Sequence, residues 1–140
     1  MNPFTVRGRQ RLLDAAPWSV LHADYQWRQT RNEFIELQPR CQCCAREKNL
    51  QVHHVLPWHL FPSFRYDLNN LLTMCQACHL RLGHMNNWKK FNYRILTSVG
   101  CIHACWPEDV RWGTFKRDPE FLHVLHREVR DWRAQEAELP

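Results

Sequence analysis

The stretch that decides the fold runs from Cys41 to His79 and reads CQCCAREKNLQVHHVLPWHLFPSFRYDLNNLLTMCQACH. Each end carries a Cys-x-x-Cys pair, Cys41 with Cys44 and Cys75 with Cys78. Thiolate sulfur suits closed tetrahedral zinc sites, in which four protein ligands surround the ion. The two pairs therefore predict one structural zinc ion (Zn2+) bound by four cysteines, and scattered buried thiols are the alternative.

The chain has seven cysteines in 140 residues. An odd number cannot all pair into disulfides within one chain, and the N-terminal residues lack the hydrophobic segment of a secretory signal. We therefore expect an intracellular, reducing compartment such as the cytoplasm. Cys43 lies inside the first pair and is an alternative zinc ligand. Cys101 and Cys105 have no evident set of further ligands, and core packing is expected for them.

Two short strands are predicted between the cysteine pairs. Residues 50–56 are rich in β-branched side chains and lie between Asn49 and Pro57, and residues 71–74 fit a second strand. A helix is expected to begin at the second cysteine pair, with Gly83 as a point where it breaks or bends. The zinc would then clamp the strand pair to the start of this helix.

Helices are predicted on both sides of the strand pair. A short helix is predicted at residues 9–16, before Pro17, and apolar spacing predicts helices at residues 22–37 and 87–99. In the latter, the residues at helical spacing are Trp88, Phe91, Ile95 and Val99. In a last helix Asp118 is the expected N-cap and Pro119 the first helical residue. Glycine is scarce and no flexible linker is evident. We expect residues 1–140 to form a single α+β domain, with flanking helices over about 9–37 and 87–138.

His53 and His54 are adjacent on the first predicted strand. Adjacent side chains on a strand point to opposite faces, so one histidine can face a metal ion while its neighbour faces a substrate. Two histidines on an exposed strand edge are the simpler interpretation of this pair alone. His79 directly follows the second cysteine pair on the predicted helix, so His53 and His79 could converge on one ion.

These cysteines and histidines, together with Asn70, resemble an HNH endonuclease of the ββα-metal type with a four-cysteine zinc site. The resemblance extends from Cys41 to His84, about a third of the chain, and residues 1–40 and 85–140 carry no comparable signature. It implies an α+β fold built around a small zinc-stapled ββα-metal core at about residues 41–84.

The resemblance also implies a role for each matching residue. His53 and His79 would bind a catalytic divalent ion, and His54 would be the general base that deprotonates the attacking water. Asn70 would hold the loop and the base through hydrogen bonds. The bacterial-toxin branch of the family has a further histidine four residues after the helix-borne ligand, where this chain has Gly83. His84 lies one place beyond, so its role as a ligand stays open.

The implied function is hydrolysis of DNA phosphodiester bonds by a metal-dependent endonuclease with a water nucleophile. Sequence cannot separate Mg2+ from Mn2+, Ni2+ or Zn2+ as the catalytic ion, because imidazole binds several metals. Two alternatives are a nucleic-acid-binding module of the same fold that does not cut and a protein-interaction domain that uses zinc only for stability. The biological role stays open among phage packaging, restriction, homing and toxin action, and so does a phage-encoded origin.

The net charge of the chain suits a polyanionic partner without identifying it. The chain has 19 Lys and Arg against 14 Asp and Glu, a net charge of +5. Double-stranded DNA is the partner we expect, with RNA and the oligomeric state left open. No stretch approaches the roughly 18 apolar residues that a membrane span requires, so no membrane function is expected.

Overall fold

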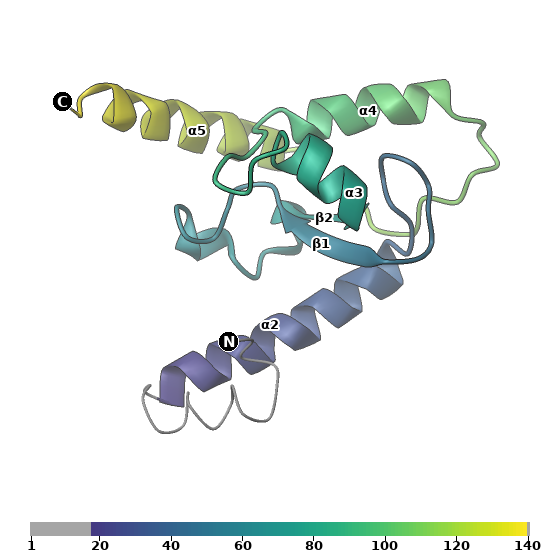
Figure 1. The fold of residues 1–140 in the computed structure, drawn as a ribbon, viewed down its shortest axis with the longest axis horizontal. Coiled ribbons are helices and arrows are strands. Elements are labelled where there is room, and N and C mark those ends of the chain that lie inside the picture. Colours follow the sequence, from purple (N-terminus) through teal and green to yellow (C-terminus); the bar gives the residue numbers. More distant parts are fainter. Residues whose placement is uncertain (1–17, 140) are drawn as a thin grey trace. The chain divides into compact units, whose positions relative to one another are not determined.

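The computed structural model describes residues 18–139 of the chain, so the helix predicted at residues 9–16 lies outside the described residues. The elements are α2 (Trp18–Leu37), β1 (Leu50–His54), η1 (Pro62–Phe64), η2 (Leu68–Asn70), β2 (Leu71–Cys75), α3 (Gln76–Cys78), η3 (His79–Gly83), α4 (Ile95–Cys105) and α5 (Phe121–Ala137) (Figure 1). Helices combined with a small antiparallel sheet confirm the predicted α+β class. Among the described helices, none is long and apolar enough to cross a membrane.

The chain divides into two compact units, Met1–Glu33 and Phe34–Pro140. The described part of the first unit is helical and belongs to α2, in which the Thr30 hydroxyl donates to the Gln26 carbonyl one turn earlier. The second unit contains both strands and every later helix. The predicted helix at residues 22–37 is confirmed by α2, and the single domain over residues 1–140 stays a prediction.

The two strands pair antiparallel, with Leu50 opposite Cys75 and His54 opposite Leu71. They confirm the predicted strand pair, although β1 ends at His54 rather than at residue 56. All residues of β2 are buried, and four of its five side chains are apolar, Thr73 being the exception. Because β2 ends at Cys75 and α3 follows at once, the second cysteine pair lies at the junction of strand and helix.

The core lies between the strand pair and the two C-terminal helices. Its largest group of buried side chains comprises Val55, Leu56, Leu72, Met74, Phe91, Ile95, Val99, Phe121, Leu125 and Val129. The members on α4 and α5 recur every four residues, which places them on one face of each helix. Helices outside the cysteine-rich segment therefore complete the core beside its strands.

The predicted helix at residues 87–99 is wrong in its first half, because α4 begins only at Ile95. Asn87 and Asn92 each accept a hydrogen bond on their side-chain oxygen from the amide two residues later, at 3.0 Å. Such turns compete with helical hydrogen bonding and hold residues 87–94 in an irregular path. Phe91 is buried as the spacing predicted, whereas Trp88 is exposed.

The start of the last helix also differs from the prediction. The side chain of Asp118 accepts from the Glu120 amide at 3.0 Å, as an N-terminal cap does. The Phe121 amide, however, bonds to the Asp118 carbonyl, so Pro119 and Glu120 form a turn and α5 begins at Phe121. The helix therefore starts two residues after the predicted position.

Core packing of Cys101 and Cys105 was a wrong prediction, because both side chains are exposed on α4. The buried face of this helix is defined by Ile95 and Val99. At about 100° per residue, positions 101 and 105 fall on the opposite, solvent-facing side. The two cysteines are exposed because Ile95 and Val99 already occupy the face of α4 that packs on the core.

Candidate functional site

The four predicted zinc ligands come together in the structure. One sulfur from each of Cys41, Cys44, Cys75 and Cys78 lies within 4.8 Å of the other three, and the Sγ atoms of Cys44 and Cys75 are 3.7 Å apart. A tetrahedral ion with Zn–S bonds of about 2.3 Å requires sulfurs about 3.8 Å apart. The cluster is therefore placed to hold one metal ion, and its all-sulfur donor set indicates zinc.

Local backbone bonds shape the first cysteine pair. The Cys41 amide donates to the Arg46 carbonyl and the Ala45 amide donates to the Cys41 carbonyl, both at 2.8 Å. Ala45 has φ of +64°, which closes this tight turn. A hydrogen bond from Cys43 lowers the pKa of Cys41, and the same bond raises the pKa of Cys43. The four clustered sulfurs include that of Cys41 and not that of Cys43, so Cys43 lies beside the site and does not replace a ligand.

Three histidines form a second cluster, which contains both of the predicted ligands of the catalytic ion. The rings of His53 and His79 lie 4.9 Å apart between centroids, and His84 lies 5.1 Å from the former and 4.8 Å from the latter. One nitrogen from each ring lies within 4.8 Å of the other two. The expected convergence of His53 and His79 is present, and His84 joins them.

The π-helical turn η3 explains how His84 reaches the cluster. In η3 the His84 amide donates to the His79 carbonyl five residues earlier, at 3.1 Å. A π turn holds one more residue than an α turn, so position i+5 lies where position i+4 would otherwise be. The sequence left the role of His84 open, because in an α-helix the residue one turn after His79 is Gly83.

Gly83 makes room for the buried His53 ring. A Cβ atom at position 83 would lie 3.1 Å from Cε1 and 3.2 Å from Nδ1 of His53, and 3.3 Å from Cδ2 of His79. These distances are shorter than ordinary carbon contacts of about 3.5–4.0 Å. Gly83, where the toxin branch of the family has a histidine, thus allows η3 to approach β1 closely.

Hydrogen bonds orient His79 and His84 in the same way. Nδ1 of His79 lies 2.6 Å from the side-chain oxygen of Gln51, and Nδ1 of His84 lies 2.6 Å from the Lys90 carbonyl. Carbonyl oxygens only accept, so each Nδ1 carries a proton, and in the neutral form of each ring Nε2 carries a lone pair. The two Nε2 atoms face each other at 3.2 Å. Two lone pairs at this distance repel unless a cation lies between them.

His53 contributes a deeply buried ring, 2% exposed, to the same cluster. Neither of its nitrogens has a hydrogen-bond partner among the described residues. Burial lowers the pKa of His53 well below its ordinary value, and burial also lowers the pKa of His79 to about 4. Neutral imidazoles are the form that binds metals, and a buried nitrogen without a partner is costly. The three rings therefore fit a divalent cation.

Gln51 is a functional residue that sequence reasoning missed. It lies two positions before His53 on β1, so the two side chains share a face of the strand. Its bond to Nδ1 fixes which nitrogen of His79 points into the cluster. Partners of this kind orient metal-binding histidines in many proteins. The spacing from His53 is the signal that could have identified it.

His54 points away from the cluster side of β1 and is half-buried. Its Nε2 lies 3.0 Å from the Arg65 carbonyl, so Nε2 carries the proton and Nδ1 is the basic nitrogen. Burial lowers the pKa of His54 to about 4. The ring is thus neutral at physiological pH, although its pKa lies below the near-neutral range that suits a general base.

Asn70 is fully buried and holds the loop that follows β1. Its amide nitrogen donates to the carbonyls of Leu56 at 2.9 Å and Phe64 at 3.1 Å, and its oxygen accepts from the Leu56 amide at 2.7 Å. These bonds tie the two ends of the loop together. Because Arg65 follows Phe64 directly, they also support the carbonyl that accepts from His54.

Comparison with protein families agrees with this geometry. Residues 41–85 match the family model described as HNH endonuclease. This segment is similar to an HNH domain and is called the HNH domain below. The match covers about a third of the sequence and includes both clusters. Searches of curated proteins and of solved structures gave no match. HNH domains act on nucleic acids, so a nuclease-type or nucleic-acid-binding function follows for this segment.

Trp88 covers the outer side of the histidine cluster of the HNH domain. Its ring centroid lies 5.2 Å from that of His79 and 4.9 Å from that of His84, and 54% of the residue is exposed. In the sequence Trp88 recurs at helical spacing with Phe91 and Ile95. The irregular segment before α4 instead turns the indole toward the imidazoles and the solvent.

The four-cysteine cluster predicts that Cys75→Ala releases zinc and unfolds the HNH domain. Structural zinc in small domains contributes about 10–16 kcal/mol of apparent binding energy that is also folding energy. Zinc content by mass spectrometry and thermal unfolding by circular dichroism measure the outcome. Cys101→Ala is the matched control, because this exposed cysteine lies outside the cluster. An unchanged zinc content and melting temperature in Cys75→Ala would contradict a four-cysteine site.

A matched pair of glycine substitutions tests the crowding at His53. Gly100→Ala should raise the melting temperature, because no atom lies within 4 Å of the added Cβ and alanine stabilises helices by about 1 kcal/mol relative to glycine. Gly83→Ala should weaken Ni2+ binding to the zinc-loaded protein at least tenfold, measured by calorimetry, because its Cβ would displace the His53 ring. Equal Ni2+ affinity in both variants would rule out the arrangement described for this ring.

Gln51 is predicted to position His79. Gln51→Leu should lower Ni2+ affinity by about 10–100-fold, since loss of such a partner releases the ring from its orientation. Gln51→Glu keeps an acceptor for Nδ1 and should restore most of the affinity. Calorimetric titration of the zinc-loaded variants measures both values. If the leucine variant binds Ni2+ as tightly as the glutamate variant, the bond to Gln51 does not orient the ligand.

Proposed function

We propose that this protein is an endonuclease that hydrolyses DNA phosphodiester bonds with a divalent metal ion and a water nucleophile. The observation that carries the proposal is the cluster of three imidazoles, in which the Nε2 atoms of His79 and His84 face each other at 3.2 Å. They lie beside the His53 ring, whose nitrogens have no hydrogen-bond partner among the described residues. His54 lies next in sequence on the opposite face of the same strand.

His54 is the proposed general base. Its Nε2–H is committed to the Arg65 carbonyl, so Nδ1 is the atom that takes a proton from water. The resulting imidazolium keeps its bond to the carbonyl, which favours the charged ring and offsets part of the cost of its burial. Asn70 positions the loop that supplies this carbonyl, and it does not itself exchange a proton.

His53, His79 and His84 are the proposed ligands of the catalytic ion. A divalent cation bound there would supply Lewis-acid stabilisation of the phosphate and of the leaving oxygen. Neutral ligands leave the full charge of such an ion in place. A donor set of imidazoles favours Mn2+, Ni2+ or Zn2+ over Mg2+, which prefers oxygen ligands. The four cysteines Cys41, Cys44, Cys75 and Cys78 are the proposed ligands of structural zinc.

We further propose double-stranded DNA as the substrate and a reducing intracellular compartment as the location. A net charge of +5 suits a polyanion. All seven cysteines are free thiols in the structure, and zinc binding requires that the four clustered ones stay reduced. These points support the proposal without selecting among DNA sequences.

A second candidate function is binding of nucleic acid without cleavage. The pKa of about 4 for His54 favours it, because so weak a base takes a proton from water less readily than a base with a pKa near neutrality. The same zinc site and histidine cluster would then serve structure and metal binding alone. Cleavage assays separate the two candidates.

The endonuclease proposal predicts that His54→Ala keeps the fold and the zinc but loses plasmid nicking. Removal of a general base typically lowers the rate by about 10²–10⁴-fold. Conversion of supercoiled plasmid to the nicked form, with Mn2+, Ni2+ or Mg2+, measures the rate. His123→Ala, an exposed histidine of α5, is the control and should cut like the wild type.

Undiminished nicking by a purified His54→Ala protein would remove His54 from its proposed role. A wild-type protein that cuts neither DNA nor RNA with any of these metals would replace the endonuclease by the binding module.

A further inference from the structure

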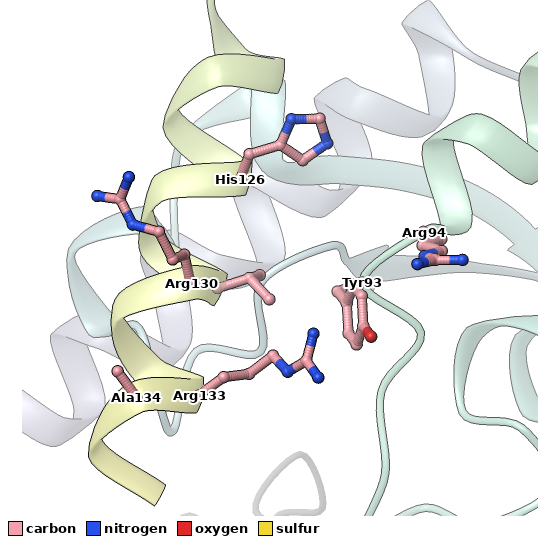
Figure 2. Close-up of a pocket in the computed structure, with 7 residues that line it drawn as sticks. Tyr93, Arg94, His126, Arg130, Arg133 and Ala134 are labelled. Atoms are coloured by element: carbon pink, nitrogen blue, oxygen red, sulfur yellow. The ribbon is translucent and has the colours of Figure 1, made fainter. Parts of the chain in front are cut away.

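A basic pocket lies outside the HNH domain, between the segment that leads into α4 and the outer face of α5. The cavity has a volume of about 520 Å³ and is lined by Tyr93, Arg94, His126, Val129, Arg130, Arg133 and Ala134 (Figure 2). None of these residues belongs to the cysteine or histidine cluster. The site described above therefore does not explain this pocket.

The lining carries positive charge and no carboxylate. His126, Arg130 and Arg133 recur at intervals of four and three residues, which brings them to one face of α5. Arg94 approaches from the start of α4. Within the described residues, neither Arg94 nor Arg133 forms an ion pair with a carboxylate, whereas Arg130 pairs with Asp131 at 3.1 Å. Two guanidinium groups thus stand uncompensated beside one cavity.

The Tyr93 ring lies beside both of these guanidinium groups. The Cζ atom of Arg133 lies 5.5 Å from the centroid of the tyrosine ring, and that of Arg94 lies 5.9 Å from it. Figure 2 shows both guanidinium groups beside the Tyr93 ring, while the side chain of Arg130 extends toward the other side of the helix. Cation–π contacts at these distances attract both arginines to the ring, and the half-buried tyrosine is anchored against the core.

Two like charges gathered around one ring repel each other, and an anion between them would relieve this repulsion. Guanidinium groups match phosphate particularly well, because their planar N–H groups bind two oxygens at once. The tyrosine ring is already engaged by the two arginines, so the pocket offers charge and hydrogen-bond donors rather than a free stacking surface. Phosphate is therefore the ligand chemistry that the pocket fits.

We propose that this pocket is a phosphate-binding site that takes a backbone phosphate of nucleic acid away from the bond that is cut. The inference rests on the proposed function only for the identity of the polymer. Contacts to backbone phosphates fix position and orientation without reading sequence. Arg94 and Arg133 would thus anchor the substrate to the C-terminal helices while the HNH domain engages the cleaved strand.

The test measures DNA binding without cleavage. Zinc-loaded His54→Ala protein is titrated with a fluorescent DNA duplex at several KCl concentrations, followed by anisotropy. When Arg94→Ala and Arg133→Ala are added to this protein, its affinity should fall by a similar factor for two DNA duplexes of unrelated sequence. The two substitutions should also reduce the slope of log K against log salt by about 1, the value for one lost phosphate contact.

The matched control removes the same charge elsewhere. Lys116→Ala with Arg127→Ala deletes two exposed cations that do not line the pocket, and Arg127 is paired with Glu128 at 3.6 Å. This control should keep the original salt slope. If the pocket variant and the control have the same slope and the same affinity, the proposal is overturned.

Two further measurements separate the sources of phosphate and the two proposals. In the first, the melting temperature is measured with inorganic phosphate for the wild type and for the variant with Arg94→Ala and Arg133→Ala. If phosphate raises it only in the wild type, but the two proteins have the same salt slope for DNA, the pocket binds free phosphate and the backbone proposal fails. A wild type that cuts nothing, yet binds DNA with a slope that depends on these arginines, contradicts the endonuclease and supports the pocket.

Discussion

The separation of the four cysteine sulfurs is the constraint on which the geometry of the HNH domain depends. A two-stranded sheet alone is marginally stable in water, and the sheet here consists of two five-residue strands. The cysteine pairs lie before β1 and across the end of β2, so a metal ion held by all four joins the sheet to α3 at one point. That junction sets the direction in which η3 leaves the sheet. The position of His79 relative to His53 follows from it.

The histidine cluster would be costly without an ion. His53 is buried with two partnerless nitrogens, and the lone pairs of His79 and His84 face each other. Both features oppose folding, because buried polar atoms lose their bonds to water. A cation bound there would form a ligand bond with one nitrogen of His53 and with the facing Nε2 atoms of the other two rings, so metal binding and stability would be coupled. The π turn and Gly83 fit this account, since π turns often occur at functional sites.

Sequence predicted those parts of the site that depend on covalent spacing and on the period of a strand. The cysteine pairs and the opposite faces of His53 and His54 are of this kind, whereas Asn70 was singled out only by the resemblance to the HNH family. It did not predict His84, because a π turn leaves no mark in the spacing of apolar residues. It missed the bond from Gln51 because nothing local distinguishes a ligand's partner from an ordinary polar residue of a strand. The helix predicted at residues 87–99 failed where asparagine side chains compete with helical bonds, although Phe91 kept its place in the core.

The side chains that pack α5 and Tyr93 on the core also determine where the arginines of the basic pocket lie. On α5, Phe121, Leu125 and Val129 face the core, and the arginines of the basic pocket begin on the adjoining strip of the same helix. A helix is rigid over such a distance, so the contacts that bury Val129 also fix where Arg133 lies. Tyr93 acts in the same way at the other wall, because it packs on the core and contacts both Arg94 and Arg133. The core thus fixes the backbone positions from which Arg94 and Arg133 extend toward the pocket, as an anchoring surface for a rigid polyanion requires.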